Sequence, residues 1–235
     1  LAARDTLGDV GTSISTKTEY QRQSDEDVVA ANFARLQQSL RTLEEFAKAE
    51  SADAAAVLEQ LRYQAYTLHR AVGITSDSIQ QLATARLYVL LDGQESPSAL
   101  RDLATALVAA GVDVLQLRDK RLSDRELLQR AKVLREVTAS MSALFVMNDR
   151  ADLARLSNAD GIHVGQEELT VSDVRKIVGP EMLVGISTHN MEQARQAVLD
   201  GANYLGVGPM FASRTKQVDA FAGLEFAQAV ATEIK

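Results

Sequence analysis

Six short runs rich in β-branched, aliphatic and aromatic residues recur in the second part of the chain, each followed by a segment of helical periodicity. The runs are RLYVLL, VDVLQLR, ALFVMN, GIHV, MLVGIS and YLGVG, at residues 86–91, 112–118, 143–148, 161–164, 182–187 and 204–208. This alternation predicts a parallel β-sheet whose faces are covered by helices. Six such units predict either an open sheet or a (β/α)8 barrel whose last two units are absent from this sequence.

The first part of the chain has only helical periodicity. Ser24 is a suitable N-cap residue, and the acidic residues 25–27 follow it in what would be the first turn. Apolar residues then recur at spacings of three and four, at Val29, Phe33, Leu36, Leu40, Leu43 and Ala47, and again at Leu58, Leu61, Ala65, Leu68 and Val72. This pattern predicts a helical hairpin. We therefore divide the chain into a helical module over residues 1–85, itself incomplete, and a βα region over residues 86–235.

Composition excludes several classes of protein. The chain has 235 residues, of which 46% are hydrophobic and 24% charged, as in ordinary globular domains. No apolar run approaches the roughly 20 residues of a membrane span, and the net charge of −7 disfavours binding to nucleic acid. The lack of Cys excludes disulfides and is compatible with a reducing, cytoplasmic location. The chain begins with Leu1 and has no signal-like segment, which indicates a processed or excised piece.

Polar side chains gather where the predicted strands end, at the edge where parallel α/β folds place their reactive groups. Gln116, Arg118 and Lys120 are two residues apart, so an extended chain would direct all three to one face. The later strands lead into Asn148 and Asp149, into His163 with Gln166, Glu167 and Glu168, into Ser187 and His189, and into Ser213, Thr215 and Lys216.

Each set also has a structural explanation. Asn148 and Asp149 could form a turn or cap the following helix, and two adjacent glutamates could be a solvated helix start. His163 could be a hydrogen-bonded structural imidazole, the basic row after Val112 could mark an edge strand, and the last set could lie on a surface loop. The coincidence of all five sets at one edge favours a functional site.

The chemistry of these residues suits a pyrophosphate. Its oxygens could be bound by the cations Arg118, Lys120 and Lys216, by the hydroxyls of Ser213 and Thr215, and by backbone amides near Gly206 and Gly208. Asp149 and Glu168 are carboxylates of the kind that hold Mg²⁺ against phosphate oxygens. Neither a P-loop nor a GxGxxG motif is present, so nucleotide-binding folds of those two types do not explain the pattern.

Five motifs in order resemble those of thiamine-phosphate synthase, a (β/α)8 barrel family: QLRDK, NDRADLA, ADGIHVGQEEL, GISTHN and GANYLGVGPMFASRTK. The resemblance implies a Mg²⁺-dependent transferase of thiamine biosynthesis. Its small-molecule substrates would be hydroxymethylpyrimidine pyrophosphate and a thiazole phosphate. The pyrophosphate leaves to give a pyrimidine cation, which the thiazole nitrogen captures, so no nucleophilic side chain is needed.

The resemblance also implies roles for individual residues. Substrate would be bound by Gln116, Arg118, Lys120, Asn148, Ser187, Ser213, Thr215 and Lys216, of which Arg118, Lys120, Ser187 and Lys216 would be catalytic. Asp149 and Glu168 would hold Mg²⁺. The family usually has Asp in place of Glu168 and Pro-Thr in place of Ala212 and Ser213. Its thiazole-phosphate cup comes from two further strands, which would lie beyond Lys235.

The first part of the chain resembles the helical module fused ahead of some bacterial thiamine-phosphate synthases, a module associated with hydroxymethylpyrimidine-phosphate kinase activity. The matching stretches are ARDTLGDVGT, AANFARLQQSLRTLEEFAK and LEQLRYQAYTL. No ATP site can be identified from these residues. The polar residues Asn32, Arg35, Arg41, Glu44 and Glu45 could instead form the solvated side of the hairpin.

Two other functions stay open from the sequence. A thiazole tautomerase-like isomerase would use His189 as acid and base and would need no Mg²⁺. A non-catalytic phosphate-ligand-binding barrel would share the fold and lack turnover. The sequence is compatible with a homo-oligomer and does not fix the oligomeric state.

Overall fold

A computed structural model of the chain describes residues 24–211 and 223–234. The chain forms two compact units, one ending at His69 and the other beginning at Arg70. None of the described helices combines the length and apolar character needed to cross a membrane.

The first unit contains the predicted helical hairpin. Helix α1 spans Asp25–Ala47, and helix α2 spans Ala52–Leu82 and so continues past the division between the units. Ser24 is the N-cap of α1, as predicted, and its Oγ accepts a hydrogen bond from the Asp27 backbone N–H at 3.2 Å. This bond satisfies one of the free amide donors of the first turn.

The interface between α1 and α2 includes only part of the predicted apolar face: Val29, Phe33, Leu40 and Ala47 are half-buried, but Leu36 and Leu43 are not. Leu36 and Leu43 are 46% and 53% exposed, whereas Glu44 is 4% exposed and accepts a hydrogen bond from Arg62 Nε at 2.9 Å. The solvated-side interpretation is therefore wrong for Glu44. An ion pair is tolerated in this position because each charge has a close partner of opposite sign. The spacing of apolar residues could not predict it.

The second unit contains a six-stranded sheet in which all pairs are parallel and the strand order follows the sequence. The strands are β1 (Tyr88–Leu91), β2 (Val114–Leu117), β3 (Leu144–Asn148), β4 (Gly161–Val164), β5 (Leu183–Thr188) and β6 (Tyr204–Val207). The helices after them are α3 (Pro97–Ala109), α4 (Asp124–Met141), α5 (Ala151–Leu156), α6 (Val171–Val178), α7 (Met191–Asp200) and α8 (Gly223–Glu233). All six predicted strands are confirmed.

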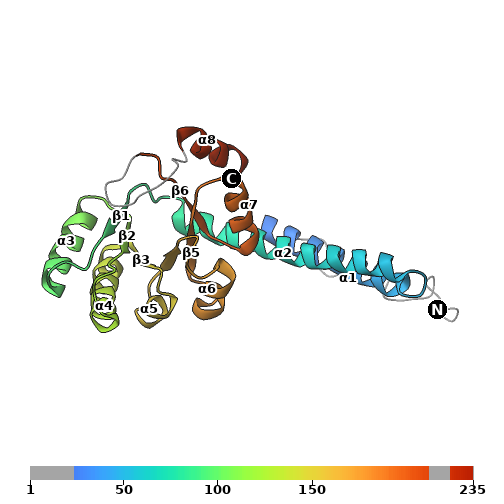
Figure 1. The fold of residues 1–235 in the computed structure, drawn as a ribbon, viewed down its shortest axis with the longest axis horizontal. Coiled ribbons are helices and arrows are strands. Elements are labelled where there is room, and N and C mark those ends of the chain that lie inside the picture. The colour runs from blue at the N-terminus through green and yellow to red at the C-terminus, as the bar shows by residue number, and fades with distance from the viewer. Residues whose placement is uncertain (1–23, 212–222, 235) are drawn as a thin grey trace. The chain divides into compact units, whose positions relative to one another are not determined.

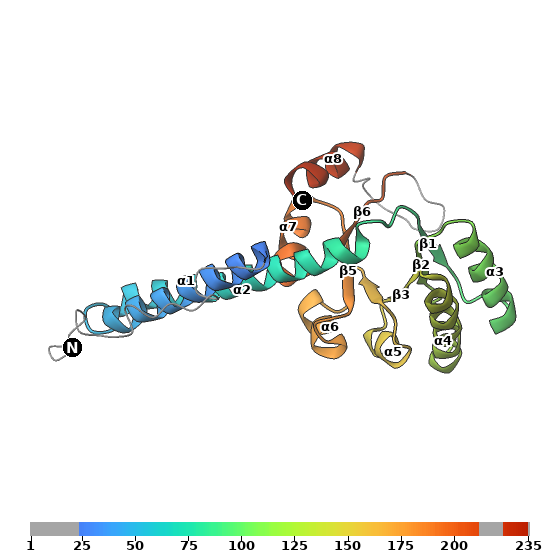
Figure 2. The same cartoon turned by 180° about the vertical axis from the view of Figure 1, so that it is seen from behind.

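One face of the sheet carries the main hydrophobic core. Alternate strand residues such as Leu115, Phe145 and Ile162 are fully buried in the same cluster as residues from α3, α4, α5, α6 and α7. Helices α3 to α6 lie side by side along this face in both views of the molecule (Figures 1 and 2). Burying a side chain of this size stabilises the fold by roughly 1.5–3 kcal/mol. The opposite face of the strands is not covered by these helices and forms the inner side of the curled sheet described next.

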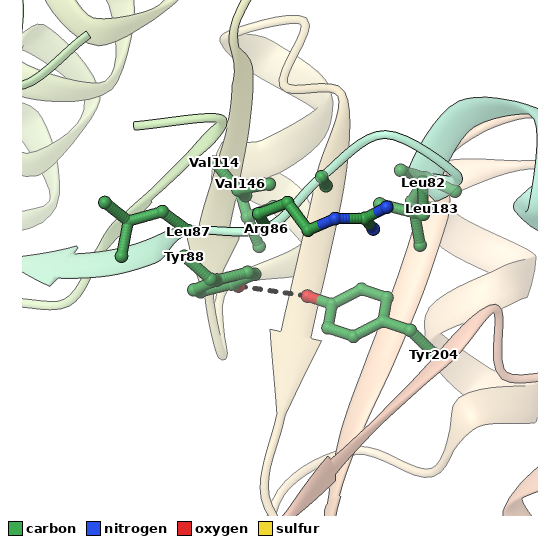
Figure 3. A pocket seen from close by; sticks show the side chains of 9 residues that line it. Leu82, Arg86, Leu87, Tyr88, Val114, Val146, Leu183 and Tyr204 are labelled. Carbon is green, nitrogen blue, oxygen red and sulfur yellow. Dashed lines mark hydrogen bonds between the residues drawn. The ribbon is translucent and has the colours of Figure 1, made fainter. Parts of the chain in front are cut away.

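The sheet curls so that its first and last strands approach each other across the interior. In a flat sheet, strands five positions apart would be separated by about 24 Å. Yet the hydroxyls of Tyr88 on β1 and Tyr204 on β6 are 3.1 Å apart. Figure 3 marks this hydrogen bond with a dashed line. The described residues thus form a curled half-barrel. The closed eight-stranded barrel of the family is not completed within them.

Local sequence features set where the helices begin. Ser123 and Glu126 form the capping box at the start of α4: Ser123 Oγ accepts from the Glu126 N–H, and Glu126 Oε2 accepts from the Ser123 N–H. Thr170 and Asn190 cap α6 and α7 through their side chains in a similar way. These caps fix the points at which the chain leaves the strand ends, where the polar residues gather.

We expect Gly185→Ala to destabilise the second unit. A Cβ built on Gly185 would lie 2.1 Å from Cζ of the Tyr204 ring. Inserting a methyl group into a packed interior costs typically about 1–3 kcal/mol. Urea unfolding measures the effect. The control is Gly73→Ala in α2, where an added Cβ meets nothing within 4 Å and should be neutral or stabilising. Similar unfolding midpoints for the two variants would contradict the packing described here.

Candidate active site

The row of polar residues formed by Gln116, Arg118 and Lys120 runs from the buried interior to the surface. Gln116 lies on the strand and is 2% exposed, and the Lys120 side chain is 62% exposed. The strand is shorter than predicted, because β2 ends at Leu117 and both cations follow it. The Arg118 N–H still extends the pairing by donating to the Leu91 carbonyl at 2.8 Å. Since β2 lies between β1 and β3, the edge-strand explanation is wrong.

Asp119 holds the loop that carries these cations. Its side chain is 1% exposed and accepts hydrogen bonds from the backbone N–H groups of Gly93, Arg121 and Leu122 at 3.1, 2.8 and 3.4 Å. The Arg121 guanidinium also contacts it, and this hydrogen bond holds the pKa of Asp119 well below its usual range. Sequence reasoning gave Asp119 no role. Its place between two cations in QLRDK was the one available indication.

Two carboxylates from different strand ends share one lysine. Lys120 Nζ lies 3.7 Å from Asp149 Oδ2 and 3.9 Å from Glu168 Oε1. Burial raises the pKa of Asp149, and the negative charge of Glu168 raises it further, while Lys120 opposes both effects. Arg118 also opposes them through its positive charge, though less than Lys120, so the repulsion between the two carboxylates is only partly compensated. A divalent cation would relieve this repulsion.

Asp149 adopts a backbone conformation that is uncommon for a residue with a side chain. Its φ is 61°, in the left-handed region, and its N–H donates to the His163 carbonyl at 2.8 Å. Such conformations are costly and concentrate at functional sites. The helix-capping explanation is wrong here, because the N-cap of α5 is Arg150, which makes no side-chain capping bond. The Asn148 side chain instead hydrogen-bonds Asp149, which lowers the pKa of Asp149.

Glu168 folds back over its own loop. A Cβ on Gly165 would lie 2.3 Å from Glu168 Oε2, so the glycine provides the space for this carboxylate. Among the described residues, no group of three or more His, Cys, Asp or Glu side chains is placed to hold a metal ion. Two carboxylates nevertheless fit Mg²⁺, which commonly binds one or two carboxylates together with water and substrate phosphates.

Polar side chains also line the interior below this charged mouth. His163 Nε2 lies 3.0 Å from Ser187 Oγ, and His163 Nδ1 lies 3.3 Å from the Tyr204 hydroxyl. The Gln166 side chain donates to the Ser187 carbonyl at 2.6 Å. The structural interpretation of His163 agrees with these bonds. Ser187 is held at its hydroxyl by His163 and at its carbonyl by Gln166, and its role in binding stays a prediction.

Sequence reasoning missed both interior tyrosines. Tyr88 accepts a hydrogen bond from Gln116 Nε2 at 2.7 Å and contacts Tyr204. Burial is the main cause that raises the pKa of each tyrosine, so both hydroxyls stay neutral. Each tyrosine stands at the start of a strand in an otherwise apolar run. Tyr88 is two residues from Leu90 and Tyr204 is two residues from Gly206, so each pair shares one face of its strand. This spacing does not indicate that the two tyrosines meet each other.

Several predicted residues have no described geometry. Ala212, Ser213, Thr215 and Lys216 lie outside the described residues, so their predicted roles stay predictions. His189 is exposed after the end of β5, where its Nδ1 contacts the Gly208 carbonyl.

Comparisons with known proteins agree with this geometry. The family model described as thiamine monophosphate synthase matches residues 87–235, and that of the ThiD2 family matches residues 1–71. A thiamine-phosphate synthase of Rhodopirellula baltica is 45% identical over 231 residues, which are 96% of this chain and 61% of that protein. One of Gloeobacter violaceus is 44% identical, with 96% and 65% covered. The chain thus spans somewhat under two thirds of the length of these relatives.

A solved structure shares the fold. The thiamine phosphate pyrophosphorylase from Pyrococcus furiosus is 28% identical, with a TM-score of 0.54, and the match covers 64% of this chain and 71% of that one. The likeness thus extends from sequence to backbone.

Replacing Asp119 with Ala should destabilise the protein at neutral pH by about 1–3 kcal/mol, because buried amide donors lose their acceptor. The pKa of Asp119 in the folded protein lies below the unfolded value of about 3.9. The contribution of its charge to the free energy of unfolding is therefore complete above about pH 4. It is lost as the pH falls toward the folded pKa. Unfolding at a series of pH values should show the variant approaching wild type in acid. Asp102→Ala, at an exposed site on α3, is the control. A gap that stays constant down to acid pH would contradict this account.

Proposed function

The chain belongs to the thiamine monophosphate synthase family, and from this premise we propose that the full-length protein condenses hydroxymethylpyrimidine pyrophosphate with a thiazole phosphate. The products would be thiamine phosphate and pyrophosphate. The observation that carries the proposal is the placement of Lys120 between the carboxylates of Asp149 and Glu168, above a polar interior. This arrangement suits a substrate with a charged end and a polar, uncharged ring.

Exposed cations would receive the charged end of the substrate. Arg118 and Lys120 follow β2 at the mouth, where a diphosphate can reach them from solvent. Their loop is already fixed by Asp119, so little ordering is needed when the substrate binds. Charge that builds on the departing pyrophosphate is then met by cations already in place.

Asp149 and Glu168 would hold Mg²⁺, which, when bound, would supply positive charge to the pyrophosphate oxygens. The residues present fit this ion, because their oxygens are hard ligands and because burial and, after it, the negative charge of Glu168 raise the pKa of Asp149. Glu168 in place of the family's Asp keeps the same ligand chemistry with one more methylene group.

The uncharged ring would enter the interior beside Gln116 and Ser187. In the proposed reaction the bond from the pyrimidine methylene to the pyrophosphate oxygen breaks, and the electron pair leaves with the pyrophosphate. The thiazole nitrogen then supplies the pair for the new C–N bond. The protein positions the two partners and stabilises charge, so the site needs no nucleophilic side chain.

The alternative isomerase receives less support from the geometry. His189 is its candidate acid and base, yet its Nδ1 contacts the Gly208 carbonyl on a loop after the strand. An isomerase would also leave the paired carboxylates without a role. For the first unit, the match to the ThiD2 family supports a proposal of hydroxymethylpyrimidine-phosphate kinase activity in the full-length protein. Transfer of phosphate from ATP to that substrate would test it separately.

We expect Asp149→Asn to lower kcat/KM for thiamine phosphate formation by about 100-fold or more, because it removes a charged ligand at the reacting centre. The assay mixes both phosphorylated precursors with full-length protein and Mg²⁺. Asp152→Asn is the matched control, since Asp152 lies three residues away and pairs with Arg150 at the surface. We expect replacement of His163 to matter less than that of Asp149.

Three outcomes would count against the proposal. Equal, mild effects of the Asp149 and Asp152 changes would mean that the metal site is misplaced. Isomerisation of a thiazole substrate without Mg²⁺, in place of thiamine phosphate formation, would favour the isomerase. Ligand binding without product, in a folded protein with both substrates, would favour a non-catalytic barrel.

A further inference from the structure

A continuous row of hydrogen bonds crosses the interior and joins the two residues assigned to the pyrimidine. It starts at Gln116 on β2, passes through Tyr88 on β1, Tyr204 on β6 and His163 on β4, and ends at Ser187 on β5. The successive distances are 2.7, 3.1, 3.3 and 3.0 Å. Five strands of the sheet therefore contribute one side chain each.

The curled sheet makes room for this row at two glycines. A Cβ on Gly185 would lie 2.1 Å from the Tyr204 ring, and one on Gly206 would lie 2.9 Å from Cε1 of His163. Both glycines are inside strands, where glycine weakens the sheet unless another group must approach closely. The absence of both side chains lets the two rings lie across neighbouring strands.

A mostly apolar cavity underlies the row. It has a volume of about 170 Å³ and is lined by residues at the amino ends of the strands, among them Val114 and Leu183, and by Arg86 (Figure 3). The tyrosine hydroxyls are hydrogen-bonded within the row, as polar groups beside apolar side chains need to be. This cavity lies at the other end of the strands from the charged mouth.

Hydrogen-bond donation runs in one direction along the row, from Gln116 to Ser187, if every buried proton is to find an acceptor. The Gln116 amide donates to Tyr88, so the single proton of Tyr88 is free to point to Tyr204, and that of Tyr204 to His163 Nδ1. A neutral imidazole that accepts at Nδ1 carries its proton on Nε2, which faces Ser187 Oγ. Ser187 then accepts from the protein and has its own proton left to donate.

We propose that Tyr88 and Tyr204 are positioning residues that set the hydrogen-bonding polarity of Gln116 and Ser187 toward the pyrimidine. The row fixes His163 as the Nε2–H tautomer, makes Ser187 a donor to a ring nitrogen, and leaves Gln116 Oε1 as an acceptor for an exocyclic amine. An aminopyrimidine presents this combination of groups. The inference rests on the proposed function for the identity of the ligand, but the tautomer can be tested without any substrate.

The first experiment is ¹⁵N NMR of the imidazoles in full-length protein without substrates. The His163 resonances are assigned by their loss in His163→Asn, which separates them from those of the other histidines, His69 and His189 among them. We expect the Nε2–H tautomer in wild type and a mixture of tautomers in Tyr204→Phe. Tyr63→Phe is the matched control, because this tyrosine is 55% exposed on α2. An Nδ1–H tautomer in wild type, or no change in Tyr204→Phe, would overturn the proposed direction.

The second experiment is a kinetic double-mutant cycle. We expect Tyr204→Phe to raise KM for the pyrimidine pyrophosphate by about three- to tenfold, the usual worth of one hydrogen bond, with KM for the thiazole phosphate unchanged. Combined with Ser187→Ala, it should add little, because both changes break the same row. Tyr88→Phe should couple to a Gln116→Ala change in the same way. Fully additive effects, or equal changes in both KM values, would show a merely structural role.

The two experiments fail in different ways. If folded wild type makes no thiamine phosphate, the proposed function is wrong, and the NMR result still decides whether the row has the direction described. If wild type is active but the cycle is additive, the function stands and the positioning role is rejected.

Discussion

Parallel pairing in sequence order is the constraint on which the rest of the second unit depends. It places every strand's carboxyl end at one edge, so residues far apart in the chain, such as Lys120 and Glu168, meet there. The curl of the sheet adds the second condition, because it turns the inner faces of β1 and β6 toward each other. Apolar residues on the outer face hold the helices and leave the inner face available for polar groups.

The site consequently has two parts with different physical chemistry. The mouth is exposed and charged, with Lys120 Nζ nearly 4 Å from each of two carboxylates, which is a weak pairing in a solvated position. The interior is lined by hydrogen-bonded polar side chains, and its tyrosines remain protonated because burial raises their pKa. The charged end of a substrate can therefore bind at the solvated mouth, while an uncharged ring is recognised by fixed hydrogen bonds in the interior. This division fits a substrate that is anionic only at one end.

Much of the architecture could be predicted from the sequence because it depends on local patterns. The six strands, the hairpin and the capping box at Ser123 all follow from periodicity and capping chemistry. The meeting of Lys120, Asp149 and Glu168 at one edge follows from the parallel sheet alone. What could not be predicted depends on tertiary packing. The pair of Glu44 with Arg62 in the hairpin interface and the meeting of Tyr88 with Tyr204 join residues whose patterns give no sign of each other.

The missed residues share a physical role that explains why motif reasoning overlooks them. Asp119 acts on Arg118 and Lys120 through backbone amides, and Tyr204 reaches Ser187 only through His163. Neither belongs to a recognisable motif by itself, so composition and spacing assign Asp119 to a loop and Tyr204 to a core. Yet a cation or a hydroxyl contributes to a transition state only if it is already oriented when charge develops. The specificity of such a site therefore depends as much on these supporting contacts as on the residues that touch the substrate.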